Sequence, residues 1–180
     1  MIFQEFKPAF LFVGKFLGLY LLGNLLYGIY IESFDDRVDT LTYVVTEQTA
    51  GFLGWCGEDV TVQQTPDRPT VSLLNTSQKV ISVFEGCNGV NVMIVFVSFM
   101  IAFGGPGKAL FVYTFLGLVL IHLVNIGRVS LLYYTAKEYR DYFYYLHKYF
   151  FTAILYGVVF MMWAFWIYKF NMRGNRKQDV

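Results

Sequence analysis

The residues of this 180-residue chain best suited to chemistry are Cys87, Arg128 and His147. Cys87 lies within Glu85–Gly89 (EGCNG), between a short segment rich in β-branched and aromatic residues and an uncharged apolar run. A thiolate is a good nucleophile when a base or a positive charge stabilises it. An imidazole can accept the thiol proton and return it to a leaving amine, and a guanidinium can stabilise the thiolate or an oxyanion. The three side chains together would support acyl transfer.

Four further polar residues are candidates to support these three: Glu85, Asn88, Asn91 and Asn125. Asn125 and Arg128 are three residues apart and would share a helical face, which favours a polar face turned into the protein. Asn91 is one helical turn after Cys87 and would point the same way. Glu85 is either a loop charge or a partner of Arg128, and the sequence does not choose between the two.

The composition is that of an integral membrane protein. Apolar residues make up 56% of the chain and charged residues 15%. A soluble domain of this size could not bury 19 Phe and 14 Tyr in one core without exposing large apolar patches. Four stretches have about the length and apolarity that a membrane-spanning helix requires: residues 8–31, 86–103, 108–127 and 149–170. The whole chain, residues 1–180, reads as one membrane domain.

The segment between the first and second spans, residues 32–85, is predicted to be folded. Ser33 or Asp35 could cap a helix, and apolar residues recur behind them at near-helical spacing: Val38, Leu41, Val44, Val45, Phe52 and Trp55. We expect this helix to lie on the membrane surface. Three short strands follow at 60–63, 70–74 and 79–84, with turns at 65–69 and 75–77. The predicted fold class is an all-α membrane protein of four transmembrane helices, with a small extracytoplasmic helix and a short β segment between the first two.

The distribution of charged residues predicts the orientation of the protein in the membrane. Residues 32–85 carry nine acidic residues and three basic ones, whereas bases cluster in the C-terminal tail at Arg173, Arg176 and Lys177. The positive-inside rule then places both termini in the cytoplasm and the acidic segment outside. Cys87 would start the second span, Arg128 end the third and His147 start the fourth, all on the extracytoplasmic face. The topology alone would bring the three side chains to one membrane depth.

This pattern resembles the exosortase/archaeosortase family of membrane transpeptidases. The resemblance rests on Glu85–Gly89 at a strand-to-helix junction, Asn125-x-x-Arg128 and a lone His147 opening the last helix, and it runs from about Leu73 to Phe160. The short chain and the Cys-Asn-Gly form are most like the exosortase F branch of Bacteroidetes. Many family members have Cys-Ser-Gly here, and most have more spans.

The resemblance implies that Cys87 is the nucleophile, Arg128 its stabilising base partner and His147 the third catalytic residue. The implied partners are secreted proteins with a C-terminal motif, a transmembrane helix and a basic tail. The enzyme would cleave at the motif through a thioester and pass the acyl group to an amine at the cell surface. It would act in the cytoplasmic membrane as a multi-pass protein, without a cofactor.

Other interpretations stay open at this stage. Cys87 could be a packing residue, or could pair with Cys56 in an oxidising compartment. His122 competes with His147, although an interhelical hydrogen bond suits it better. Two cysteines and two histidines at different depths do not form a zinc site. The alternative functions are a membrane peptidase with water as acceptor and a non-enzymatic assembly or transport subunit. The net charge of +1, with no basic stripe, gives no support for nucleic-acid binding.

Overall fold

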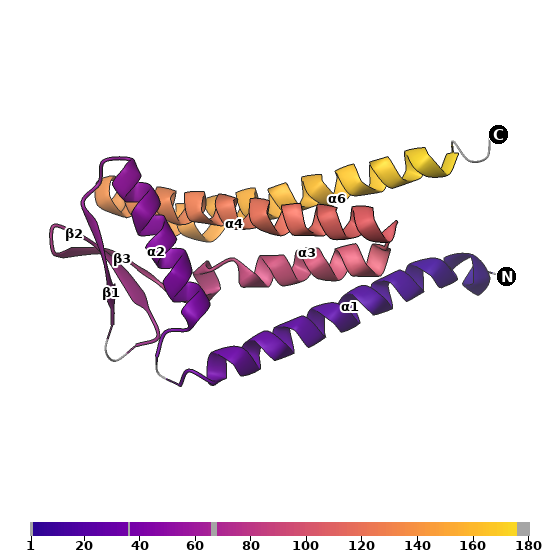
Figure 1. Ribbon diagram of the computed structural model, residues 1–180, viewed down its shortest axis with the longest axis horizontal. Coiled ribbons are helices and arrows are strands. Elements are labelled where there is room, and N and C mark those ends of the chain that lie inside the picture. Colours follow the sequence, from indigo (N-terminus) through magenta and orange to yellow (C-terminus); the bar gives the residue numbers. More distant parts are fainter. Residues whose placement is uncertain (1, 36, 66–67, 176–180) are drawn as a thin grey trace.

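The computed structural model describes residues 2–35, 37–65 and 68–175. One bundle contains four helices, α1 (Ile2–Glu32), α3 (Val90–Phe103), α4 (Gly107–Glu138) and α6 (Phe151–Asn175). At one end of it lie α2 (Thr40–Trp55) and the strands β1 (Val60–Gln64), β2 (Val71–Asn75) and β3 (Gln78–Val83). The start of α1 and the end of α6 lie at the opposite end (Figure 1). Short helical turns complete the chain: η1 (Glu85–Cys87), η2 (Arg140–Tyr142), α5 (Phe143–Tyr145) and the π-helical η3 (Leu146–Phe150).

The structure confirms a mostly helical membrane protein with a small sheet, but the helix in the second predicted span is shorter than expected, and four spans stay a prediction. Three helical segments among the described residues are long and apolar enough to cross a bilayer: Phe6–Glu32, Gly107–Glu138 and Arg140–Lys169. The helix predicted at 86–103 begins only at Val90 and has 14 residues, or about 21 Å of rise, against about 30 Å of hydrocarbon. It starts late because Gly89 has a left-handed backbone, with φ 83°, and ends the preceding turn.

The helix in the third predicted span, 108–127, is longer than that span. The helix α4 continues to Glu138, so Arg128 lies ten residues before its last residue instead of at its end. The added part stays helical because Val129 and Tyr133 are buried against the sheet and α2. This second core is separate from the one inside the bundle, and Cys87 belongs to it. The last helix, predicted at 149–170, is α6 preceded by η3.

The helix α2 is present, but it buries a different face from the one expected. Its N-cap is Asp39, whose carboxylate accepts a hydrogen bond from the Thr42 N–H at 2.9 Å, instead of Ser33 or Asp35. The buried face is rich in threonine and includes Thr42, Val45, Thr46, Thr49, Ala50 and Leu53. Most of the predicted apolar stripe is exposed: Leu41, Val44, Phe52 and Trp55. That stripe is free to meet lipid, and the membrane-surface position of α2 stays a prediction.

The three predicted strands are confirmed to within one or two residues. They form an antiparallel meander in the order β1-β2-β3, and β3 leads directly into η1. The sheet therefore delivers Glu85–Gly89 to the edge of the bundle. Pro66 and Asp67 of the first predicted turn, and Arg176 and Lys177 of the basic tail, lie outside the described residues.

Candidate active site

The cysteine turn, residues Glu85–Gly89, is a tight 3-10 turn between β3 and α3. The Cys87 N–H donates to the Phe84 carbonyl at 2.8 Å. A Cβ on Gly89 would lie 3.1 Å from the Asn125 side chain, and its φ of 83° is one that other residues rarely adopt. Glycine therefore allows both the left-handed backbone at the end of the turn and the close approach of α4. The thiol of Cys87 is free and only 4% of the residue is exposed.

Asn125 joins the cysteine turn to Arg128. Its side chain is fully buried, and its Nδ2 donates to the Cys87 carbonyl at 2.9 Å. Its Oδ1 accepts from Nη1 of Arg128 at 3.3 Å. The predicted three-residue spacing on one helical face thus places the amide between the cysteine backbone and the guanidinium. One side chain of α4 fixes the position of both.

Opposing effects act on the Cys87 thiol. Burial is the largest effect and raises the pKa of the thiol overall, while the positive charge of Arg128 acts in the opposite direction and lowers it. Glu85 raises it further through its negative charge. The one ion pair recorded among the described residues joins Lys137 to Glu58, so Glu85 is not paired with Arg128 there. Arg128 is therefore the residue that favours a thiolate at this buried position.

His147 reaches the same region from the last hairpin. It lies in the π-helical turn η3, half-buried, and its ring stacks on Phe143 at a centroid distance of 5.7 Å. It interacts electrostatically with Arg128. In the described part of the chain, His147 Nδ1 and Arg128 Nε are buried without a hydrogen-bond partner. Buried polar atoms are nearly always paired, so these two are candidates to contact a substrate.

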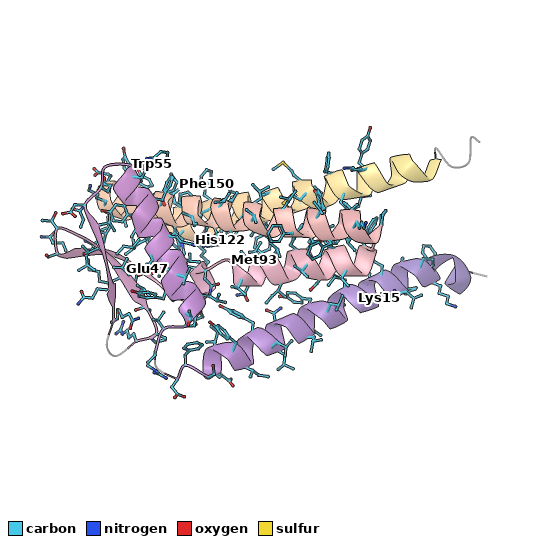
Figure 2. All side chains as sticks on the ribbon, in the orientation of Figure 1. Lys15, Glu47, Trp55, Met93, His122 and Phe150 are labelled. Atoms are coloured by element: carbon cyan, nitrogen blue, oxygen red, sulfur yellow. The ribbon has the colours of Figure 1, made fainter. Side chains whose placement is uncertain are left out.

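The structure separates the remaining sequence candidates. Asn91 is exposed at the start of α3 and does not share the buried surroundings of Cys87. His122 forms a 2.7 Å hydrogen bond with Gln48, where α2 crosses the bundle (Figure 2). That is the interhelical role expected for it. Cys56 is exposed and free, so no disulfide joins it to Cys87. No group of three residues suited to a metal occurs among the described residues.

Asn88 is almost fully buried and makes three hydrogen bonds. Its Oδ1 accepts from the N–H of Val90, the first residue of α3, at 3.0 Å. Its Nδ2 donates to the Tyr27 hydroxyl at 2.7 Å and to Thr42 Oγ1 at 3.0 Å. Sequence reasoning missed Tyr27 and Thr42. The available signal was weak: Tyr27 carries a hydroxyl among the apolar residues near the end of the first predicted span, and Thr42 is one of several threonines in the segment that follows.

The comparisons with known proteins give one match. The family model for transmembrane exosortases (Exosortase_EpsH) matches residues 9–168. No curated protein and no solved structure matches the chain.

Proposed function

The chain belongs to the transmembrane exosortase family, and we propose that it is a cysteine transpeptidase whose nucleophile is Cys87. Family membership suggests a membrane transpeptidase. The proposed substrates are secreted proteins that end in a short motif, a transmembrane helix and a basic tail. The acceptor is an amine at the cell surface. The Cys-Asn-Gly form of residues 87–89 supports the F branch.

The proposed reaction has two acyl transfers. His147 takes the proton from the Cys87 thiol, and the thiolate attacks the scissile carbonyl, forming an S–C bond and an oxyanion that Arg128 stabilises. The oxyanion collapses, the C–N bond breaks, and the leaving amine takes the proton from the imidazolium. An acceptor amine then attacks the thioester carbonyl. A new C–N bond forms, the C–S bond breaks, and the proton lost by the amine returns to the sulfur.

The observation that carries the proposal is the position of Arg128. It interacts electrostatically with both Cys87 and His147, which come from separate elements of the chain. A buried thiol is inert unless a charge or a base stabilises its thiolate, and Arg128 supplies that charge. The unpaired Nε of Arg128 and Nδ1 of His147 leave donor or acceptor capacity for a substrate.

The proposed site lies on the extracytoplasmic side of the cytoplasmic membrane, with both termini in the cytoplasm. The supporting pattern is that basic residues cluster in the C-terminal tail, whereas the 54 residues of 32–85 carry only three of them. The sheet and the cysteine turn are then at the same side of the membrane as a secreted substrate.

The test is to trap the acyl-enzyme. The protein is co-expressed with a reporter that ends in a motif, a membrane helix and a basic tail, taken from a protein of the same organism. We expect a reporter adduct on Cys87 that hydroxylamine cleaves, and its loss in Cys87→Ala but not in Cys56→Ala. Mass spectrometry of the product then separates an amide at the new C-terminus from a free acid, which would indicate water as the acceptor. Adducts that persist in Cys87→Ala would overturn the assignment.

A further inference from the structure

The cysteine turn is held from three sides by helices that are distant in sequence. From α4, Asn125 donates to the Cys87 carbonyl at 2.9 Å. From α1, the Tyr27 hydroxyl donates to the Glu85 carbonyl at 3.3 Å. The polypeptide on both sides of the thiol is therefore fixed by a side chain of another helix.

The Tyr27 hydroxyl is also the acceptor of a second hydrogen bond. It accepts a 2.7 Å hydrogen bond from Nδ2 of Asn88, the residue directly after the cysteine. The other proton of that amide is donated to Thr42 Oγ1 at 3.0 Å, and Thr42 is fully buried on α2. The Tyr27 hydroxyl thus donates to the Glu85 carbonyl and accepts from the Asn88 side chain, so it contacts the chain on both sides of Cys87.

We propose that Tyr27 is a positioning residue for the Cys87 thiol. This inference rests on the proposed function. It means that α1, besides anchoring the protein in the membrane, holds the cysteine turn in place. Tyr27 holds the Glu85 carbonyl directly and the Asn88 side chain at its other end. The turn is then locked with the sulfur buried and facing Arg128 instead of free to rotate towards solvent. Enzyme reactions are sensitive to such placement, since a shift of about 1 Å can cost about 100-fold in rate.

The test must separate the effect of the Tyr27 hydroxyl from the packing of its ring. The ring stacks on Tyr30 at a centroid distance of 6.2 Å and contributes to packing. Tyr27→Phe keeps the ring and removes only the hydroxyl. Tyr30→Phe is the matched control, because it makes the same change one helical turn away on a hydroxyl with no recorded hydrogen bond in the described residues.

Two rates are measured on each variant in the full-length protein carrying Cys56→Ser, so that Cys87 is the sole thiol. The first is alkylation of Cys87 by iodoacetamide, a small neutral reagent, in detergent-solubilised protein. The second is processing of the sorting-signal reporter at matched membrane abundance. For Tyr27→Phe we expect alkylation to become several-fold faster, because the released turn exposes the sulfur. We expect processing to slow by roughly 10-fold through kcat, with KM unchanged.

The opposite direction of the two rates identifies positioning. A residue that only supports folding would lower abundance and thermal stability, and the two rates per folded molecule would not diverge. Alkylation at the wild-type rate in Tyr27→Phe would overturn the inference, as would an equal increase in Tyr30→Phe. Absence of processing in the wild type would overturn the proposed function instead, and the alkylation comparison would still decide whether Tyr27 fixes the turn.

Discussion

Replacement of Arg128 by lysine distinguishes a catalytic arginine from a membrane anchor. In the structure the guanidinium donates from Nη1 to Asn125 at 3.3 Å, its charge opposes the rise that burial causes in the pKa of the Cys87 thiol, and its Nε is unpaired. A lysine ammonium is a compact charge on a flexible stem and cannot present this planar set of donors. It can keep part of the electrostatic attraction to the thiolate, but not the hydrogen bond to Asn125 together with a second donor directed at a substrate.

The expected loss follows from the number of donors removed. Loss of one oxyanion-type donor typically lowers kcat by about 100- to 1000-fold. Arg128→Lys should therefore lower kcat by about 100- to 1000-fold. Arg128→Gln, which also loses the charge, should lower it further. If Arg128 only anchored α4 at the headgroups, a lysine would snorkel equally well and processing would stay near the wild-type rate.

The assay is processing of the reporter at matched membrane abundance, with a pH profile of Cys87 alkylation as a second measurement. Arg128 lowers the pKa of the thiol, so its removal raises that pKa. Below the pKa the thiolate fraction falls as the pKa rises, and the alkylation curve of Arg128→Gln should move to higher pH. Wild-type processing by Arg128→Lys, with an unshifted alkylation curve in Arg128→Gln, would refute the reasoning.

Three further predictions concern single residues. Cys56→Ala should process the reporter normally, whereas Cys87→Ala should abolish processing; equal loss in both, at normal abundance, would contradict the separate roles. His147→Asn should lower kcat by about 100-fold or more, and that loss should be present at pH values on both sides of neutrality; a silent substitution would remove the imidazole from the mechanism. Gly89→Ala should lower processing at least 10-fold, because its Cβ would press on the asparagine of α4. Gly57→Ala has a similar left-handed φ of 93° but open space around it, so comparable losses in the two would point to backbone strain alone.

Local patterns were readable from the sequence. The three strands carry β-branched residues between turn residues, and the structure reproduces them closely. Asn125 and Arg128 share a helical face because a spacing of three residues dictates it. The cysteine turn follows from the glycines beside the thiol. Each of these features depends on neighbours in the chain, which the sequence displays directly.

Helix ends were less predictable because tertiary contacts set them. Hydropathy ended the third span at Gly127, since the next residue is charged. The sheet and α2 cover the following segment, so α4 continues to Glu138. Conversely, the apolar run at 86–103 loses its first turn because Gly89 adopts a left-handed backbone.

The reversed face of α2 has a side-chain explanation. Thr46 Oγ1 donates to the Thr42 carbonyl at 2.7 Å, and Thr49 Oγ1 donates to the Val45 carbonyl at 2.8 Å. These hydroxyls are satisfied within their own helix, so burying them carries little penalty. A search for apolar periodicity treats threonine as polar and assigns it to the outer face. In a membrane protein the apolar stripe can instead meet lipid, and the threonine face can pack inside.

The shortness of α3 is what sets the depth of the candidate site. From the connection between α3 and α4, the 14 residues of α3 rise about 21 Å before η1 adds a few more. Along α4, the 21 residue steps from Gly107 to Arg128 rise about 32 Å. Both paths end near the limit of a hydrocarbon layer of about 30 Å. A peptide bond just before a substrate's transmembrane helix lies at that same depth. The depth that Cys87 and Arg128 reach along these two helices therefore favours the proposed class of substrates over soluble peptides.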